Sequence, residues 1–262
     1  MLCWPNIHAG DRRMSAIPLP SALVNRLRSA RRVAVLTGAG ISAESGVPTF
    51  REAQTGLWAQ YNPEELATPR AFRRQPKLVW EWYAWRQQRI RQAEPNPGHQ
   101  ALVSMERHIP EFTLITQNVD SLHRRAGSHQ ILELHGNIFR TKCFSEDRPV
   151  ESWPDGDEIP PRCPRCGGLL RPDVVWFGEM LPATALHAAE HAAATAEIFF
   201  SIGTSALVYP AADLPLRALD AGATVVEINP QPTPLSSCVT FSLNGAAGEI
   251  LPALVAQAWE AI

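Results

Sequence analysis

Short apolar runs separated by helix-like segments constrain the fold of this chain more than any other feature. The apolar runs span residues 32–37, 112–116, 131–134, 198–203, 224–229 and 239–241. Helical patterns cover residues 21–30, 183–196 and 211–221, and Gly222 is suited to end the last helix. Strands that alternate with helices are typical of a parallel sheet covered on both faces. We therefore predict an α/β fold with a Rossmann-like parallel sheet and helices on both of its faces.

Two regions interrupt this alternation. Residues 51–100 are helical and rich in Trp and Arg, whereas residues 140–180 are irregular, rich in proline and hold three clustered cysteines. We expect these insertions to form a smaller helical and zinc-ribbon domain. The large Rossmann-like part of the catalytic domain, which covers 16–262, then consists of residues 16–50, 101–139 and 181–262. Residues 1–15 are expected to be a disordered N-terminal extension.

Charge and cysteine content limit the class of protein. The 262 residues include 24 basic and 26 acidic side chains, with a formal net charge of -2, which does not favour a nucleic-acid or membrane-surface partner. No apolar run approaches the roughly 18–20 residues of a membrane span. An odd number of cysteines, three of them clustered, fits a reducing compartment and a metal site better than disulfides. We expect a cytoplasmic protein that binds neither nucleic acid nor membranes.

A glycine-rich turn follows the first apolar run. The segment from Gly38 to Ala43 has the spacing G-x-G-x-x-A, in which glycines let backbone N–H groups approach a pyrophosphate. An ordinary strand-to-loop turn is the alternative. The acidic ribose ligand of dehydrogenases, expected about 20 residues further on, is missing, and residues 43–48 favour a loop over a helix.

Six motifs in register resemble those of the sirtuins, the NAD-dependent protein lysine deacylases. These motifs are residues 38–51 (GAGISAESGVPTFR), 116–120 (TQNVD), 134–136 (LHG), 175–179 (VWFGE), 203–205 (GTS) and 228–229 (IN). The resemblance runs from about residue 20 to the C-terminus. Within the family, Tyr83-Ala-Trp-Arg86 is similar to the Tyr-x-x-Arg of the branch that removes succinyl, malonyl and glutaryl groups.

The resemblance implies a reaction in which NAD is consumed as a co-substrate. The acyl-lysine carbonyl oxygen attacks C1′ of the nicotinamide ribose and expels nicotinamide. His135 then helps a ribose hydroxyl to attack the resulting imidate, and the products are lysine and O-acyl-ADP-ribose. An imidazole suits the role of general base because it titrates near neutral pH. Without the resemblance, a structural histidine would be the simpler interpretation.

The resemblance also assigns the remaining residues of the site. Asn118 and Asp120 join His135 as catalytic residues, and with Ile41 and Ser42 they line the nicotinamide pocket. Phe50 is expected to shield C1′ from water, and Arg51 to support the phosphates. Turn and cap chemistry is the alternative role for the polar residues after the second strand. The expected NAD-binding residues are Gly38, Ala39, Gly40, Ile41, Ser42, Phe50, Arg51, Gln117, Asn118, Val119, Asp120, Gly203, Thr204, Ser205, Asn229, Gln231 and Ala247.

Two segments are expected to bind the substrate. Tyr83 and Arg86 share a helix face, and a guanidinium with a phenol can bind an acyl carboxylate; a solvated helix face is the alternative. Residues 175–179 resemble the strand that pairs with the substrate backbone in sirtuins. Val175, Phe177, Gly178 and Glu179 are therefore expected to contact the acyl-lysine protein.

The cysteine cluster departs from the family pattern. Cys163 and Cys166 have the C-x-x-C spacing of half a zinc knuckle, and Cys143 belongs to the other half, where Glu146 replaces the second cysteine. One structural zinc ion with three thiolates and this carboxylate is expected, and a degenerate site that binds metal weakly is the alternative.

Other functions remain open at this stage. NAD-dependent ADP-ribosyl transfer to protein uses the same cleavage at C1′, and a non-catalytic NAD-binding sensor would keep the same fold. A zinc-ribbon nucleic-acid module is disfavoured because the net charge is slightly negative. We expect a monomeric deacylase that prefers the acidic succinyl, malonyl and glutaryl groups; whether it also accepts acetyl-lysine is left open at this stage.

Overall fold

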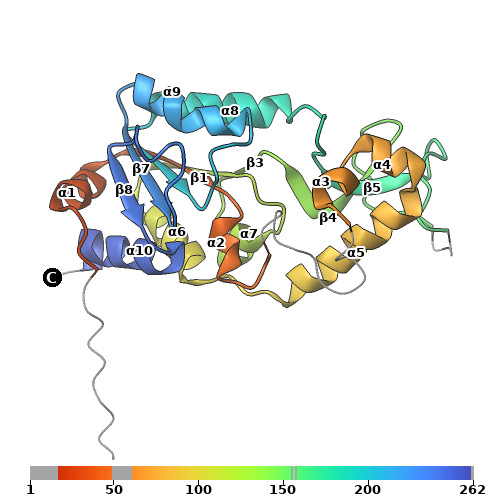
Figure 1. The fold of residues 1–262 in the computed structure, drawn as a ribbon, viewed down its shortest axis with the longest axis horizontal. Coiled ribbons are helices and arrows are strands. Elements are labelled where there is room, and N and C mark those ends of the chain that lie inside the picture. Colours follow the sequence, from red (N-terminus) through yellow and green to blue (C-terminus); the bar gives the residue numbers. More distant parts are fainter. Residues whose placement is uncertain (1–16, 49–60, 155, 157, 261–262) are drawn as a thin grey trace, which may run out of the picture.

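The computed structural model describes residues 17–48, 61–154, 156 and 158–260 (Figure 1). The strands are β1 (Arg32–Thr37), β2 (Glu111–Thr116), β3 (Ile131–Glu133), β4 (Gly136–Cys143), β5 (Leu170–Val174), β6 (Ile198–Ile202), β7 (Thr224–Asn229) and β8 (Phe241–Asn244). The α-helices are α1 (Ser21–Ser29), α2 (Gly40–Ala43), α3 (Pro63–Leu66), α4 (Pro69–Arg74), α5 (Pro76–Gln92), α6 (Pro97–His108), α7 (Leu122–Ala126), α8 (Ala183–Thr195), α9 (Leu214–Asp220) and α10 (Ala247–Val255). Two short turns of other helix types are η2 (Ala211–Asp213) and η3 (Ala256–Glu260).

Six strands form the predicted parallel sheet, in the order β3-β2-β1-β6-β7-β8. Strands β2 and β3 therefore extend the sheet on one side of β1, and β6, β7 and β8 extend it on the other, so the direction of the strand order switches between β1 and β6. This is the strand order of dinucleotide-binding sheets, and ligands bind outside the carboxyl ends of the strands at such a switch point. The fold class is confirmed.

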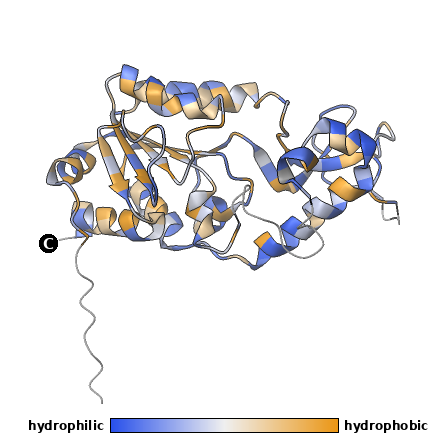
Figure 2. Cartoon of the chain, in the orientation of Figure 1, coloured by the Kyte–Doolittle hydropathy of each residue, from blue (hydrophilic) through white to orange (hydrophobic). Residues whose placement is uncertain are grey.

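Helices cover both faces of the sheet, as its apolar strands require. In β1, Val33 and Val35 pack in a cluster with α1, α6 and α10, whereas Ala34 and Leu36 pack on the opposite side with α8 and α9. Figure 1 shows the two helix layers above and below the strands. In Figure 2, β7 and β8 are largely orange while α8 and α9 alternate between orange and blue, which is typical of amphipathic covering helices.

Some predicted boundaries shifted. The last strand was predicted over 239–241, but β8 spans Phe241–Asn244. Residues 140–180 were predicted to be irregular, and the structure instead contains most of an antiparallel pair, β4 with β5. Gly222 ends the helical region before β7 with φ +85°, as predicted.

A second group of elements lies at one end of the sheet, on the right in Figure 1, and consists of α3, α4, α5, β4 and β5. Its own apolar cluster includes Phe72, Trp82, Tyr83 and Trp176. The separate clusters support our proposal of a large part and a small part. The boundary proposed at residue 101 falls inside α6, because this helix begins at Pro97.

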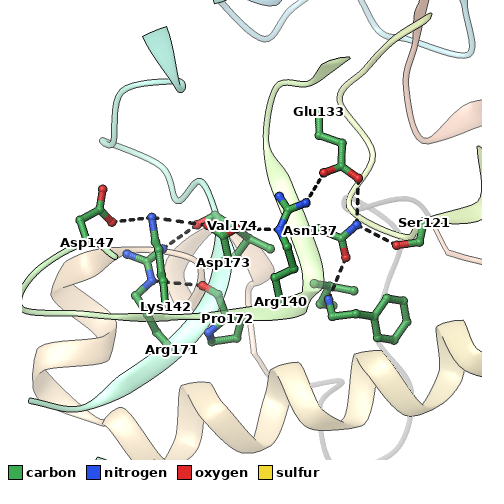
Figure 3. A network of polar contacts seen from close by, with 12 residues as sticks. Ser121, Glu133, Asn137, Arg140, Lys142, Asp147, Arg171, Pro172, Asp173 and Val174 are labelled. Carbon is green, nitrogen blue, oxygen red and sulfur yellow. Dashed lines mark hydrogen bonds and ion pairs between the residues drawn. The ribbon is translucent and has the colours of Figure 1, made fainter. Parts of the chain in front are cut away.

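Ion pairs follow the β4–β5 ladder (Figure 3). Arg140 bridges Glu133 at 2.5 Å and Asp173 at 2.9 Å, and Lys142 lies 2.6 Å from Asp147. Partly exposed pairs of this kind contribute little each to stability, about 0–1 kcal/mol. Within the described residues, none of the helices has both the length and the apolar composition needed to cross a membrane.

Candidate active site

Three glycines meet backbone to backbone at the switch point between β1 and β6. A Cβ on Gly38 would lie 2.7 Å from the Gly203 carbonyl oxygen, and one on Gly40 would lie 2.6 Å from the Gly203 Cα. Gly203 itself has φ +60°, and a Cβ there would lie 2.5 Å from the amide nitrogen of Ile41. Only glycine permits this close packing, which holds the ends of the two strands together.

A cleft opens at these strand ends and runs to α5 and the segment after β5. It encloses about 590 Å³, which is within the range of small-molecule sites in proteins, roughly 300–1,000 Å³. Its lining includes the following predicted residues: Gly38, Ala39, Gly40, Ser42, Tyr83, Arg86, Gln117, Asn118, Val119, Asp120, His135, Val175, Phe177, Gly178, Glu179, Gly203, Thr204, Ser205, Asn229 and Gln231. The structure therefore gathers residues from seven separate segments into one site.

Four of the predicted NAD- and substrate-binding residues are not in this lining. Phe50 and Arg51 lie outside the described residues. Ile41 is fully buried in the apolar cluster under the sheet, and Ala247 begins α10 within the same cluster. The described cleft is thus formed without Ile41 and Ala247.

Where the cleft meets the sheet, hydrogen bonds hold the strand ends together. The Gln117 side chain donates to Thr204 Oγ1 at 3.1 Å, and the Asn229 amide donates to the Thr204 carbonyl oxygen at 3.1 Å. These bonds join the ends of β2, β6 and β7. Backbone amides, hydroxyls and side-chain amides are groups that suit ribose and phosphate.

Buried Glu227 organises the loop beyond Asn229. Its carboxylate accepts hydrogen bonds from the hydroxyls of Thr233 and Ser236, from Ser242 Oγ at 3.3 Å and from Asn229 Nδ2 at 3.4 Å. Glu227 is only 1% exposed, so these donors replace the water that its charge would otherwise need. Loop residues 230–233 line the cleft, and Glu227 therefore shapes a wall of it.

A polar network occupies the floor of the cleft. Ser42 Oγ donates to Asp120 Oδ2 at 2.7 Å, and Asn118 Nδ2 donates to Ser42 Oγ at 3.2 Å and to the Gly38 carbonyl oxygen at 2.9 Å. The Leu122 amide donates to the other Asp120 oxygen at 2.8 Å. Burial raises the pKa of Asp120, and these two hydrogen bonds and the nearby arginines oppose the rise. The network fixes the orientation of Asn118 and Asp120.

His135 precedes β4 and lies at the centre of the cleft. Its Nδ1 lies 2.9 Å from the Gln117 carbonyl oxygen. Since a carbonyl only accepts, we assign the proton of the neutral ring to Nδ1, which leaves the Nε2 lone pair to accept a proton. Burial lowers the pKa of His135, and its hydrogen bond with Gln117 opposes this, so the net shift favours the neutral ring. A Cβ on Gly136, where φ is +77°, would collide with the Asp173 carbonyl oxygen, which explains the His-Gly pair.

Tyr83 and Arg86 of α5 also line the cleft. The Tyr83 hydroxyl accepts a hydrogen bond from Trp176 Nε1 at 2.9 Å. Burial raises the pKa of Tyr83 to about 12, so the phenol keeps its proton. Burial also lowers the pKa of Arg86, and the electrostatic effects of Tyr83 and Asp120 oppose this. Both side chains lie on the face of α5 that lines the cleft, as their spacing of three residues on a helix predicts.

Residues 175–179 are not a strand, which corrects the prediction. β5 ends at Val174, and a turn follows in which the Glu179 amide donates to the Trp176 carbonyl oxygen at 2.9 Å. Arg171 is the physical reason: its guanidinium pairs with Glu179 at 2.5 and 3.0 Å, and Glu179 also accepts from the Trp176 amide at 2.8 Å. The Glu179 carboxylate therefore folds back onto β5.

The clustered cysteines form a candidate metal centre. The sulfur atoms of Cys143, Cys163 and Cys166 and a carboxylate oxygen of Glu146 all lie within 4.8 Å of one another. Tetrahedral zinc with bonds of about 2.3 Å needs ligand atoms roughly 3.7 Å apart, so these residues fit a structural zinc ion. Arg165 pairs with Glu146 at 2.8 Å and lowers the pKa of this carboxyl group. The ion would link β4 to the turn at 163–166.

Sequence reasoning missed three residues that shape the cleft, namely Arg171, Trp176 and Glu227. Arg171 in β5 and Glu227 in β7 are charged side chains within strands, and both are 1% exposed. A charge in a strand that is buried on both faces requires partners, and this signal could have marked them. The sequence does not indicate, however, which residues pair with Arg171 and Glu227.

The model of the Sir2 family matches residues 38–210. An "NAD-dependent protein deacylase 2" of Pyrobaculum aerophilum is 52% identical over 237 residues, which cover 88% of this chain and 92% of the relative. An "NAD-dependent protein deacylase" of Aquifex aeolicus is 56% identical over 205 residues, 78% of this chain and 85% of the relative. A crystal structure titled as a Sir2 homolog–NAD complex matches with a TM-score of 0.86 and 46% identity, covering 93% of this chain and 95% of that one.

Proposed function

The chain belongs to the Sir2 family, and we propose how the residues of its cleft carry out the family's reaction and which acyl group they favour. The protein is an NAD-dependent protein deacylase that acts on acyl-lysine in proteins. NAD supplies the ribose that receives the acyl group, and it is consumed.

The nucleotide side holds NAD at the strand ends. The backbone amides of the glycine turn and of residues 203–205 face the phosphates, and Asn229 and Gln231 bind the adenosine. Asn118 and Asp120 hold the nicotinamide end. The bonds of Gln117 and Asn229 to Thr204 support this arrangement, because they fix the three strand ends before NAD binds.

His135 is the general base. With the Nδ1 proton donated to the Gln117 carbonyl oxygen, Nε2 accepts the proton of a ribose hydroxyl. A buried, neutral imidazole is suited to this step at neutral pH, because it does not first have to lose a proton.

The acyl group is an acidic one, such as succinyl, malonyl or glutaryl. One observation carries this proposal: Tyr83 and Arg86 line the same cleft as His135 and Asp120. A guanidinium pairs with a carboxylate more strongly than with any neutral acyl group, so a carboxylate beyond the lysine amide adds binding energy that acetyl lacks.

A panel of acetyl, succinyl, malonyl and glutaryl peptides, assayed with and without NAD, tests the proposal. Arg86→Met should lower kcat/KM for succinyl-lysine by roughly 10- to 100-fold, because it removes a charge-assisted pair, while the acetyl peptide loses much less. Arg89→Met, an exposed position on the same helix, is the matched control. Equal loss with both peptides in Arg86→Met would contradict the acidic preference. Product mass separates deacylation from ADP-ribosyl transfer, which adds mass to the peptide.

Zinc content is tested separately, by elemental analysis of protein purified without added metal. About one zinc ion per chain is expected, and less than about 0.2 rejects a structural site. Replacing Glu146 by Cys should increase resistance to chelators, since it supplies a fourth thiolate.

We also propose that the protein acts as a monomer in the cytoplasm. The clustered free thiols of Cys143, Cys163 and Cys166 support a reducing compartment. Light scattering during size-exclusion chromatography should give the mass of one chain, 28.9 kDa.

A further inference from the structure

The buried indole of Trp176 lies between the turn after β5 and the acyl-binding side of the cleft. It is 1% exposed and packs against Phe72, with ring centroids 5.3 Å apart. Its Nε1 donates to the hydroxyl of Tyr83, a residue 93 positions away on α5. A buried indole N–H needs a partner, and here this partner is the phenol that faces the acyl group.

This hydrogen bond determines whether the Tyr83 hydroxyl acts as a donor or an acceptor toward a ligand. An indole N–H only donates, so the Tyr83 oxygen accepts and its own proton must point elsewhere. Within the described part of the chain, Tyr83 donates to no acceptor. The proton is therefore available to a ligand in the cleft, beside the guanidinium of Arg86.

Trp176 is itself held in place from below. The guanidinium carbon of Arg171 lies 3.2 Å from the Trp176 ring centroid. The same guanidinium forms a two-pronged pair with Glu179, whose carboxylate accepts the Trp176 amide at 2.8 Å. Arg171 Nη2 also donates to the Val174 carbonyl oxygen at 2.6 Å. Arg171 and Glu179 thus fix both the ring and the backbone of Trp176.

We propose that Trp176 is a specificity-determining residue: held by Arg171 and Glu179, it keeps the Tyr83 hydroxyl oriented as a donor to the carboxylate of an acidic acyl-lysine. This inference rests on the proposed function of the cleft. Trp176 acts through Tyr83 and is a positioning residue. An acetyl group offers no carboxylate to this donor, so the effect is selective for acidic acyl groups.

Trp176→Phe tests the proposal, because it removes the indole N–H and keeps an aromatic ring. The ratio of kcat/KM for succinyl-lysine to that for acetyl-lysine should fall roughly three- to tenfold, the usual worth of one hydrogen bond. The fall should appear mainly in KM for the succinyl peptide. Trp80→Phe is the matched control: it also removes an indole, but Trp80 belongs to α5 and packs on the cysteine cluster. Its ratio should stay at the wild-type value.

A double variant separates the specific effect from a structural one. In the Tyr83→Phe background, Trp176→Phe should change the ratio by less than about twofold, because the hydroxyl through which it acts is gone. An equal further loss in both backgrounds overturns the proposal, as does an equal loss with both peptides. If Trp176→Phe melts at a much lower temperature, Glu179→Gln serves instead, with a smaller fall in the same ratio.

Different results refute the acidic preference of the cleft and the role of Trp176. A wild-type enzyme that cleaves acetyl-lysine but not succinyl-lysine refutes the acidic preference and the role of Trp176 together. A wild-type enzyme that prefers succinyl-lysine, with an unchanged ratio in Trp176→Phe, refutes the role of Trp176 alone.

Discussion

The two sides of the cleft are built in different ways. On the nucleotide side, backbone packs on backbone: Gly38, Gly40 and Gly203 approach so closely that no Cβ fits. On the acyl side, side chains from distant elements pair with one another, as in the bond between Tyr83 and Trp176. His135 lies between the two, with its ring bonded to the end of β2 and its carbonyl oxygen accepting from Val175.

This difference indicates which side can vary. Backbone packing tolerates no side chain, so the nucleotide side should accept one ligand whatever the substrate. Side-chain pairs can be exchanged without moving the sheet, so acyl preference can change while the reaction stays the same. Changes on the nucleotide side should therefore affect every acyl substrate equally, and those on the acyl side should not.

The largest effect is expected at His135, where the two sides meet. His135→Asn should lower kcat for all acyl peptides by about 10²- to 10⁴-fold, the typical contribution of a general base. ADP-ribose binding, measured by calorimetry, should change little because the strand ends are intact. If His135→Asn loses succinyl activity but keeps acetyl activity, His135 acts on the acyl side, and the division of the cleft into two sides is wrong.

Gly203→Ala should damage the nucleotide side by forcing a side chain into the backbone contact. Left-handed strain and overpacking together should cost roughly 2–5 kcal/mol of unfolding free energy, measured by urea denaturation. Gly222→Ala is the matched control, since it has φ +85° but nothing within 4 Å of its Cβ. It should lose only the strain, about 1–2 kcal/mol. Equal losses in the two variants would show that the close approach is unimportant.

Acid should destabilise the fold through two buried histidines, His99 in α6 and His123 in α7. Burial lowers the pKa of His99 from 6.5 to about 4 and lowers that of His123 well below 6.5. The unfolded chain therefore binds protons that the folded chain does not, so stability is lost as pH falls from about 6.5 towards 4. The loss from His99 should reach roughly 1–3 kcal/mol at pH 4. His99→Gln should flatten the dependence of urea midpoint on pH, whereas His187→Gln, an exposed control, should not.

The smallest effect is expected at Glu227. Glu227→Gln places an amide donor among hydroxyl donors and loosens the loop at 230–233. KM for NAD should rise roughly three- to tenfold, by the same factor with every acyl peptide, while kcat is retained. Glu197→Gln is the control, since it makes the same charge change at the other end of the strands, where Glu197 accepts from the amides of Arg31 and Arg32. KM for NAD should be unchanged in this variant. A rise with only one peptide would contradict the division of the cleft.

Much of the fold could be predicted from residue patterns. The parallel strands, α1, α8 and the helical region before Gly222 followed from apolar periodicity, and the glycine turn marked one wall of the cleft. Ile41 could not be placed in this way, because its position beside Gly40 indicates nothing about the face that it buries. The turn at 175–179 was expected to be a strand from the family resemblance, and the pair between Arg171 and the partly exposed Glu179 has no local pattern that would have indicated the turn.

The sequence by itself determined which segments are strands and helices, where glycine is needed and which side chains can do acid–base or metal chemistry. These properties depend on neighbours within a few residues. Only the tertiary structure decided which of those side chains meet: that Trp176 donates to Tyr83, that Arg171 holds Glu179, and that Glu227 holds a wall of the cleft. The physical reason is that such contacts form only when packing of the sheet and helices brings distant segments together.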